Sequence, residues 1–470
     1  MIAQNEIKNI FFLGIGGIGM SALARYFHHR GYSVSGYDRT PSALTKELED
    51  EGIKITYTDA VTHDFCIGLP VSNTLVIRTP AVPEDSAIYT YFREQGFDIR
   101  KRAEVLGMVT RQLKALCVAG THGKTTTSTM LAHLMKMQGA EGVNAFLGGI
   151  SMNYHTNLLM DKESEYVVVE ADEYDRSFHH LTPYISVVTA VDADHLDIYG
   201  TSEAYREAFA YYTSLITGAL VMKHGIALQP RLQPGVKCYT YGVRERQEPR
   251  VEGQEPSAPD FYAENIRVKD GQIVFDFKMP DGEIRDVRLG VPVWVNIENA
   301  VAAMSVAHLC SVKAETMLEA MSSFKGVQRR FNIHVNTPRV AYIDDYAHHP
   351  EEIATAIDSI RKLYPERKLI GVFQPHLYTR TRDFAEGFRR VLSTLDECIL
   401  LPIYPARELP IPGVTSEILG GEVVQKSELV AELRRRVTAS HEAVVVLTVG
   451  AGDIDRLVPD VAKGLSEMQK

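Results

Sequence analysis

Apolar runs alternate with helical patterns over the first hundred residues of the chain. Strands are predicted at residues 9–14, 33–37 and 74–77, and a helix at 21–29 follows the first strand. Strands that alternate with helices in this way are typical of a parallel sheet, because parallel neighbours need a long crossover connection. The pattern from residue 7 to residue 106 therefore predicts one β/α unit.

A second unit begins near Lys114, where an apolar strand leads into a loop with two glycines. Further strands are predicted at residues 165–169 and 184–191, and both run into acidic or imidazole side chains. The carboxyl ends of parallel strands lie at the same edge of a sheet. We therefore expect these polar groups to face the loop that follows Lys114.

The last part of this unit has a different pattern. Residues 236–295 contain alternating strands with turns at Asp270-Gly271 and Asp281-Gly282, which predicts a small antiparallel addition. The stretch 244–260 between them is rich in Glu, Gln and Pro, and predicts a surface loop.

A third α/β pattern occupies the last part of the chain. The fold class predicted for the whole chain is α/β, with three domains at residues 1–107, 108–323 and 324–470. In the third domain the predicted strands are 340–343, 368–373, 398–402 and 443–449, and the predicted helices include 350–363 and 383–395.

Composition indicates an ordinary soluble protein. The 470 residues are 45% apolar, and 50 basic and 60 acidic residues give a net charge of −10, which argues against a nucleic-acid-binding surface. Without a leader pattern or an apolar run of 18 residues, we expect a cytoplasmic protein that does not insert into membranes. Five scattered cysteines without a CxxC pair predict reduced thiols, with no disulfide framework or zinc site: Cys66, Cys117, Cys238, Cys310 and Cys398.

The most specific chemical signal is the loop Gly120-Thr121-His122-Gly123-Lys124-Thr125-Thr126 between a strand and a helix. Exposed backbone N–H groups and one lysine suit the phosphates of a nucleoside triphosphate, and Thr125 suits Mg²⁺. Val118 stands where the usual spacing has a glycine, so the loop is a shortened variant. The alternative is an ordinary strand-to-helix turn.

A second glycine loop, Gly14-Ile15-Gly16-Gly17-Ile18-Gly19, joins the first predicted strand to the first helix. Asp38 closes the next strand about 20 residues on, where dinucleotide-binding folds place an acid that contacts a ribose. The combination predicts a diphosphate site. The alternative is that Asp38 only caps a turn.

Phosphoryl transfer needs positive charge around the transferred group. Lys124 supplies one charge, and Thr125, Glu170 and His195 are plausible ligands for Mg²⁺, which prefers oxygen. For this reason His195 is the least certain ligand, and it could equally cap a helix or orient a carboxylate. The acids Asp172, Glu173 and Asp175 are assigned no role.

Three motifs in the third domain add cationic and imidazole groups at strand ends. One of the pair Arg329-Arg330 is expected to reach a phosphate across a cleft. After the strand at 340–343, an acid of the pair Asp344-Asp345 suits a ribose hydroxyl and Tyr346 suits base stacking, while a capped turn is the alternative. A histidine of the pair His348-His349 suits an amine or a carboxylate, and Arg380 after the strand at 368–373 suits a small carboxylate. Together these motifs predict two substrates bound beside ATP.

In this order the motifs resemble the Mur ligases, from end to end of the chain: GIGGIGM, GTHGKTTT, EADE, Asp194-His195, NIENA at 296–300, GVQRRF, DDYAHHP and QPHLYTRT. The resemblance implies a Rossmann-like UDP-substrate domain, a central P-loop-type ATPase domain with a mainly parallel sheet plus a small antiparallel part, and a Rossmann-like C-terminal domain that binds an amino acid. It also implies ATP as co-substrate, with Mg²⁺ or alternatively Mn²⁺.

The resemblance assigns residues to each ligand. The catalytic set is Lys124, Glu170, His195 and Arg330, and the metal set is Thr125, Glu170 and His195. For the UDP-substrate it implies Gly14, Gly16, Gly17, Ile18, Gly19, Asp38, Thr79, Pro80 and Ala81, and for the amino acid His348, His376 and Arg380. For ATP it implies Gly120, Thr121, His122, Gly123, Lys124, Thr125, Thr126, Asn296 and Asn299 (as adenine contacts), Arg330, Asp345 and Tyr346.

Within the family, the resemblance is to the branch that joins L-alanine to UDP-N-acetylmuramate, the first peptide-adding step of peptidoglycan precursor synthesis. Sister ligases carry a carbamylated lysine where this chain has Phe209, so no carbamate is expected. We expect a monomer or weak homodimer. The alternatives are a muropeptide-recycling ligase that adds a tripeptide to the same sugar nucleotide, a nicotinamide-dependent oxidoreductase and a non-catalytic nucleotide-binding regulator.

Overall fold

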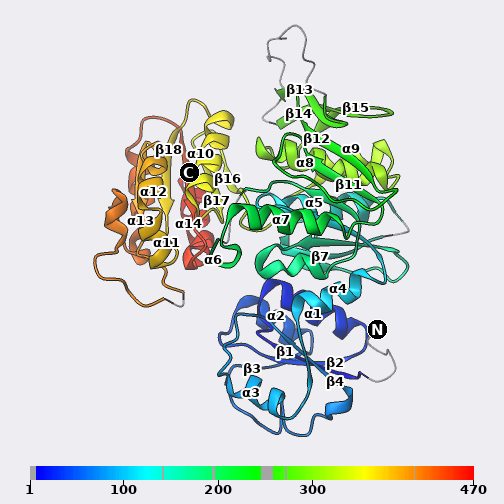
Figure 1. Cartoon of the computed structure of the whole chain (residues 1–470). Coiled ribbons are helices and arrows are strands. Elements are labelled where there is room, and N and C mark those ends of the chain that lie inside the picture. The colour runs from blue at the N-terminus through cyan, green and yellow to red at the C-terminus, as the bar shows by residue number, and fades with distance from the viewer. Residues whose placement is uncertain are drawn as a thin grey trace. The chain divides into compact units, whose positions relative to one another are not determined.

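The computed structural model describes residues 7–139, 142–192, 196–244, 258–269, 272–406 and 408–469. These residues form an α/β protein with mainly parallel sheets and some antiparallel strands, which confirms the predicted fold class (Figure 1). The chain divides into two compact units, one holding most residues up to Lys325 and the other chiefly the residues from Gly326 on. The first unit contains two sheets and the second unit contains one.

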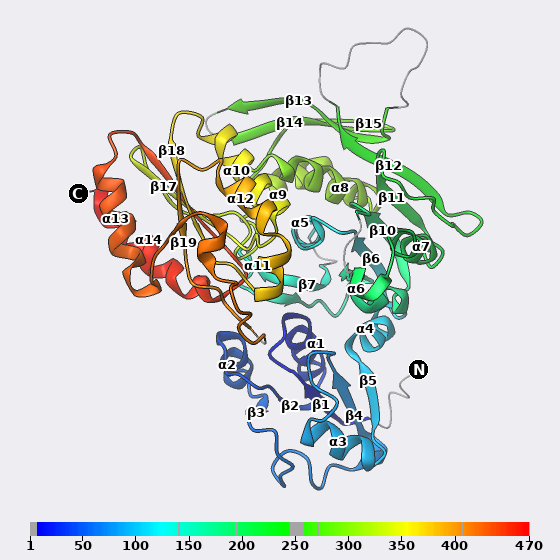
Figure 2. The same ribbon diagram turned by 60° about the vertical axis from the view of Figure 1, so that its left-hand side comes forward.

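The N-terminal sheet of the described residues is parallel, with the strand order β3-β2-β1-β4-β5. Alternate residues of β1 enter two different cores, because side chains of a strand point to opposite faces. Ile10 and Phe12 pack on the side of α1, and Phe11 and Leu13 pack on the side of α3 with Phe92. Figures 1 and 2 show α1 and α2 on one face of this sheet and α3 on the other. The elements are β1 (Asn9–Leu13), α1 (Ile18–His29), β2 (Ser33–Tyr37), α2 (Ala43–Asp50), β3 (Lys54–Thr56), β4 (Thr74–Arg78), α3 (Ala87–Glu94), β5 (Asp98–Lys101) and α4 (Arg102–Thr110).

The central sheet has the order β15-β14-β13-β12-β11-β10-β6-β9-β7-β8. Its middle strands pair in parallel, and β7–β8 and β14–β15 pair antiparallel. The strands are β6 (Lys114–Ala119), β7 (Asn144–Ser151), β8 (Thr156–Leu159), β9 (Tyr166–Ala171), β10 (Pro183–Val188), β11 (Ala219–Lys223), β12 (Lys237–Val243), β13 (Phe261–Lys269), β14 (Gln272–Met279) and β15 (Gly282–Arg288). The helices are α5 (Lys124–Met137), α6 (Leu196–Tyr199), α7 (Ser202–Thr213), α8 (Val295–Leu309) and α9 (Ala314–Ser323).

The predicted antiparallel addition is confirmed for the hairpin of β14 and β15. Met279 pairs with Gly282 across the predicted turn at Asp281-Gly282, and β14 and β15 are antiparallel. In contrast, β11, β12 and β13 pair in parallel. The connection between β12 and β13 spans residues 244–260, which is long enough for the crossover that parallel pairing needs. Asp270-Gly271 and most of the predicted loop 244–260 lie outside the described residues.

The C-terminal sheet has the order β16-β17-β21-β18-β19-β20 and is parallel except for β16. One face packs against α13 and α14 through residues such as Leu433 and Val461, and on the other face Phe373 contacts Phe388 of α12 with ring centroids 5.0 Å apart. The strands are β16 (Asn332–Asn336), β17 (Val340–Asp345), β18 (Lys368–Phe373), β19 (Glu397–Leu400), β20 (Glu422–Val423) and β21 (Val444–Val449). The helices are α10 (Pro350–Leu363), α11 (Tyr378–Asp383), α12 (Ala385–Leu392), α13 (Leu429–Ala439) and α14 (Val458–Ser466).

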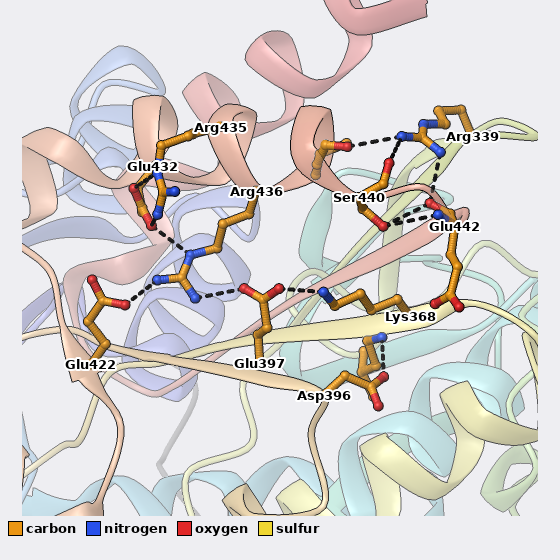
Figure 3. A network of polar contacts seen from close by, with 12 residues as sticks. Arg339, Lys368, Asp396, Glu397, Glu422, Glu432, Arg435, Arg436, Ser440 and Glu442 are labelled. Carbon is orange, nitrogen blue, oxygen red and sulfur yellow. Dashed lines mark hydrogen bonds and ion pairs between the residues drawn. The ribbon is translucent and has the colours of Figure 1, made fainter.

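An arginine at the end of α13 ties this helix to the sheet edge (Figure 3). The guanidinium of Arg436 contacts Glu432 of its own helix, Glu397 of β19 and Glu422 of β20 at 2.6, 2.8 and 2.5 Å. Lys368 of β18 binds the other oxygen of Glu397 at 2.6 Å. Because only 9% of the Arg436 side chain is exposed, these contacts are partly shielded from water and hold α13 in register with the strands.

Candidate active site

The first glycine loop joins β1 to α1. Gly17 is the N-cap of α1, and Gly14 has a φ of +87°, in the left-handed region that favours glycine. A Cβ on Gly16 would lie 2.7 Å from Cγ2 of Thr45 and 2.9 Å from Oδ2 of Asp38. Both Gly14 and Gly16 are therefore required by the path of the backbone that leads into the N-terminus of α1.

Asp38 braces this loop through the backbone. Its Oδ2 accepts a hydrogen bond of 2.8 Å from the N–H of Gly16, and its Oδ1 accepts one of 3.2 Å from the N–H of Thr40. These contacts support the loop whether or not Asp38 also meets a ribose. A ribose contact for Asp38 stays a prediction.

The second loop predicted for the UDP-substrate lies directly beside the first. The N–H of Thr79 donates to the carbonyl of Leu13 at 3.3 Å, and a Cβ on Gly14 would lie 2.5 Å from Cγ2 of Thr79. Pro80 and Ala81 follow on the exposed side of this turn. The structure thus brings the two loops together at the carboxyl ends of β1 and β4.

Arg102 closes the other side of the first loop. Its guanidinium would lie 2.8 Å from a Cβ on Gly19, two residues after the N-cap of α1, next to the exposed Ile18. The same guanidinium donates to Oδ2 of Asp172 at 3.1 Å, just beyond the end of β9. The glycine loop and the polar end of β9 are therefore neighbours within one folded unit.

The phosphate loop connects β6 to α5, and its two glycines have no room for a side chain. Gly120 has a φ of +131°, and a Cβ there would lie 2.1 Å from Oγ1 of Thr189. Gly123, with a φ of +79°, is the N-cap of α5, and a Cβ there would lie 2.7 Å from Oδ1 of Asn299. Gly123 provides no side-chain cap for the first turn of α5, which contains Thr126, and such a helix N-terminus is a natural anion site.

The residues that follow β10 hold the phosphate loop in place. The N–H of Thr121 donates to the carbonyl of Ala190 at 3.1 Å, and its hydroxyl donates to the carbonyl of Asp192 at 2.8 Å. The hydroxyl of Thr189 donates to the carbonyl of His122. These bonds satisfy the polar backbone of the loop while its outer face stays available.

Lys124 makes a buried ion pair that sequence reasoning did not predict. Its ammonium lies 2.9 Å from Oε1 and 2.8 Å from Oε2 of Glu173, whose side chain is 2% exposed. Burial raises the pKa of Glu173, and the positive charge of Lys124 opposes that rise. In the sequence Glu173 belongs to a run of acids, and no local signal separated it from the more exposed Asp172.

Thr125 and Glu170 form the oxygen pair expected for a magnesium site. The hydroxyl of Thr125 donates to Oε1 of Glu170 at 3.2 Å, across the shared edge of β6 and β9. Among the residues that the structure describes, no group of three or more His, Cys, Asp and Glu side chains is placed to hold a metal ion. His195 lies outside the described residues, so its role as a ligand stays a prediction.

Asn296 and Asn299 both lie in the first turns of α8. The side chain of Asn299 contacts the hydroxyl of Thr127, one turn into α5, at 3.1 Å. The amide of Asn296 donates to the carbonyl of Val291 at 3.3 Å. Asn299 therefore lies beside the phosphate loop, and contact of either asparagine with adenine stays a prediction.

In the second unit the two adjacent arginines have different surroundings. Arg329 donates to Oδ2 of Asp344 at 3.3 Å and to the carbonyl of Gly450 at 2.7 Å, so it is bound within the fold. Both guanidinium groups lie 5.4 Å from the centroid of the Tyr346 ring, so the hydrogen bonds of Arg329 are what distinguishes the two. Of the predicted pair, Arg330 is thus the better placed to meet a ligand.

Asp345 sits beneath this loop. Its carboxylate accepts hydrogen bonds from the N–H of Phe331 at 2.8 Å and of Ala347 at 2.7 Å. Burial raises the pKa of Asp345 to about 6, and the charge of Arg330 opposes that rise. Arg329 and Phe331 have φ of +61° and +54°, so the backbone on both sides of Arg330 is held in a strained conformation.

The three residues predicted for the amino acid lie together. The rings of His348 and His376 have centroids 6.4 Å apart, and Nη1 of Arg380 lies 3.2 Å from Nδ1 of His376. Tyr404 stacks on His376 at 5.8 Å. Burial and the nearby Arg380 lower the pKa of His376 to about 4, and burial also lowers the pKa of His348. Both imidazoles are therefore neutral near pH 7, beside a fixed guanidinium.

In the part of the chain that the structure describes, no helix is both long and apolar enough to cross a membrane.

Three family models match the chain: "Mur ligase family, catalytic domain" over residues 9–114, "Mur ligase middle domain" over residues 118–307, and "Mur ligase, glutamate ligase domain" over residues 329–452.

Individual relatives cover nearly the whole chain. A UDP-N-acetylmuramate--L-alanine ligase from Phocaeicola vulgatus is 54% identical over 465 residues, which are 97% of this chain and 98% of the relative. The crystal structure of a UDP-N-acetylmuramate-alanine ligase from Thermotoga maritima is similar at 27% identity and a TM-score of 0.78, over 98% of this chain and 99% of that one. A murein peptide ligase from Psychrobacter arcticus shares the fold at 20% identity and a TM-score of 0.66, over 97% and 98% of the two chains.

Proposed function

This chain belongs to the Mur ligase family, and we propose that it joins L-alanine to the lactyl carboxylate of UDP-N-acetylmuramate while ATP is converted to ADP and phosphate. This reaction is the first peptide addition to the peptidoglycan precursor, on which cell-wall growth and division depend. A cytoplasmic location and a monomeric or weakly dimeric state stay predictions.

The observation that carries the proposal is the adjacency of two ligand loops in one unit. Arg102 packs against Gly19 of the first glycine loop and binds Asp172. Asp172 directly follows β9, the strand that contains Glu170. A sugar nucleotide held by its diphosphate on the first loop would therefore lie near the phosphate loop that starts at Gly120. That proximity is what phosphoryl transfer between two bound substrates requires.

The first step is transfer of the γ-phosphoryl group to the lactyl carboxylate, which gives an acyl phosphate. A carboxylate alone is a poor acyl donor because its leaving group would be oxide, whereas an acyl phosphate releases phosphate. Lys124 and the N-terminus of α5 would bind the phosphate oxygens, and Arg330 would neutralise charge on the transferred group.

The residues present fit a magnesium ion. Thr125 and Glu170 offer oxygen donors that already lie 3.2 Å apart, which is the donor chemistry that Mg²⁺ prefers. When bound there, the ion would supply positive charge against the phosphate oxygens.

In the second step the amine of L-alanine attacks the acyl phosphate, and phosphate leaves. Arg380 would bind the carboxylate of alanine, and the neutral rings of His348 and His376 would contact its amine. His348 and His195 are the two candidates for the base that removes the amine proton.

The experiment is product identification by mass spectrometry. The chain is incubated with ATP, Mg²⁺ and UDP-N-acetylmuramate, together with either L-alanine or the preformed tripeptide. We expect UDP-N-acetylmuramoyl-L-alanine to form and the tripeptide to be a poor acceptor. Efficient use of the tripeptide instead of alanine would assign the chain to the recycling reaction.

A further inference from the structure

The ammonium group of Lys124 is fully engaged by acceptors of the protein itself. It donates to the carbonyls of Gly120 at 2.6 Å and Thr121 at 3.3 Å, and to the carboxylate of Glu173 at 2.9 Å. A lysine carries three N–H donors, and these acceptors account for them. A phosphate can bind Lys124 only if one of these partners yields.

Glu173 is the partner that differs in kind from the other two. The carbonyls of Gly120 and Thr121 belong to the loop itself and stay close to Lys124 in any loop conformation of this type. Glu173 is an anion with two oxygens near one ammonium, at 2.9 and 2.8 Å. It therefore offers Lys124 the same kind of contact that a phosphate would offer.

The turn after β9 fixes the position of Glu173. Tyr199 donates through its hydroxyl to the carbonyl of Glu173, Asp172 binds Arg102 at 3.1 Å, and Asp175 binds Lys101 at 2.7 Å. Asp175 and the following Arg176 have φ of +50° and +53°, a conformation that non-glycine residues rarely adopt. A backbone held on both sides in this way places the side chain of Glu173 at Lys124, so the two charges can separate only by rotation of one of these side chains.

We propose that Glu173 is a positioning residue that occupies the phosphate's place on Lys124 in the nucleotide-free enzyme and is displaced from it when ATP binds. The inference rests on the proposed function, in which Lys124 binds the phosphates of ATP. Glu173 keeps the lysine turned into the loop, and it recaptures the ammonium as ADP leaves. The carboxylate therefore weakens nucleotide binding and speeds nucleotide release.

The chain offers a matched control at the amino ends of β6 and β9, whose carboxyl ends lead to Lys124 and Glu173. Lys114 begins β6 and pairs with Glu165, just before β9, at 3.0 Å, and these side chains are 43% and 58% exposed. This pair has the same chemistry as Lys124–Glu173 but lies away from the phosphate loop. Substitution of Glu165 therefore controls for the loss of one negative charge from the domain.

The test is calorimetric titration of Mg²⁺ADP into the full-length chain, its Glu173→Gln variant and its Glu165→Gln variant. Removal of an anion beside the phosphate-binding ammonium is expected to tighten ADP binding about tenfold in Glu173→Gln and to leave Glu165→Gln like the parent chain. In steady-state assays the KM for ATP falls by a similar factor in Glu173→Gln, and kcat falls because ADP leaves more slowly. If the substitution instead damaged the fold of the Glu173→Gln variant, its KM for ATP would rise.

Equal or weaker ADP binding by a folded Glu173→Gln variant would overturn the inference. If this variant does not fold, Glu173→Asp gives the same test, because the shorter side chain draws the carboxylate away from Lys124. Tighter binding by about threefold is then expected, and unchanged or weaker binding would overturn the inference. A parent chain that binds no nucleotide would instead contradict the proposed function, so the two failures are distinguishable.

Discussion

The hydroxyl of Thr125 donates a hydrogen bond of 3.2 Å to Oε1 of Glu170, which is 45 positions further along the chain. The bond joins the first turn of α5 to β9, next to the phosphate loop. Gly148 of β7 leaves the space in which this carboxylate lies, since a Cβ there would be 2.0 Å from Oε2 of Glu170. Three elements thus determine where the proposed metal ligand points.

Gly148→Ala should displace Glu170 without touching any ligand loop. We expect turnover to fall at least about tenfold and the Mg²⁺ concentration for half-maximal rate to rise, because a ligand oxygen is moved from its site. The control is Gly242→Ala on β12, where a Cβ would make only ordinary contacts, the nearest at 3.5 Å from Pro259. Equal Mg²⁺ dependence of ADP release in the two variants would contradict the assignment of Glu170.

Lys124→Ala should lower turnover by about a thousandfold, because the charge that stabilises the transferred phosphoryl group is lost. The chain is expected to stay folded, which circular dichroism and a thermal melt would establish. Lys114→Ala removes a lysine from the far end of β6 and should leave kcat unchanged. Near-normal activity of folded Lys124→Ala would disprove the phosphate-loop assignment.

The local signals in the sequence were sufficient for the ligand loops and for the strands that lead into them. Glycine spacing, a lysine and a following helix pattern identify the phosphate loop because that motif is contiguous. Helix α10 has the predicted bounds, since Pro350 starts it and apolar spacing continues to Leu363. The glycine-rich strand β7 was missed, because Gly148 and Gly149 break the apolar pattern that marks a strand.

Features that depend on distant residues were not accessible. The burial of Glu173 results from the turn after β9 and from its contact with Lys124, 49 positions earlier, whereas its neighbours in the sequence are ordinary polar residues. The parallel pairing of β12 with β13 depends on the path of the long connection between them. Arg329 and Arg330 are neighbours of the same residue type, so the sequence does not show which of them is bound within the fold. Arg329 is the one that contacts Asp344 and Gly450.

The contribution of His376 to the stability of the C-terminal unit should fall as the pH drops from 6.5 towards 4. His376 has an ordinary pKa of 6.5 and a pKa of about 4 in the fold, so in this range the unfolded chain binds more protons than the native chain. The unfolding free energy of the parent chain relative to that of His376→Gln should therefore fall with the pH in this window. His348 and Asp345 remain in both proteins, so the difference between the two curves isolates His376. Identical curves would contradict the predicted neutral state.

Arg436→Ala should destabilise the unit by about 2 kcal/mol, because it leaves the carboxylates around the buried guanidinium without their counter-charge. The value is modest because Glu422 is 61% exposed and solvent screens it. Arg434→Ala breaks the 3.0 Å pair with Glu467, whose members are 45% and 51% exposed, and should cost less than about 1 kcal/mol. Urea unfolding of both variants makes the comparison, and equal losses would show that the network does not hold α13.

The same network should make stability sensitive to acid. Hydrogen bonds from Arg435 and Arg436 lower the pKa of Glu432 to about 2, well below its ordinary value of 4.5. Its contribution is complete above pH 4.5 and is lost as the pH falls towards 2. Glu432→Gln should therefore lose stability at pH 6 and approach the parent chain near pH 2. A difference that is constant over this range would contradict the role of the charge.

We infer that ATP is consumed only to join alanine to the sugar nucleotide. The most direct measurement is ADP release with ATP, Mg²⁺, UDP-N-acetylmuramate and L-alanine, and with each component omitted in turn. We predict sustained release only when all of them are present, because the acyl phosphate forms on the sugar nucleotide and is consumed by alanine. Sustained ADP release without UDP-N-acetylmuramate, or without any amino-acid acceptor, would contradict it.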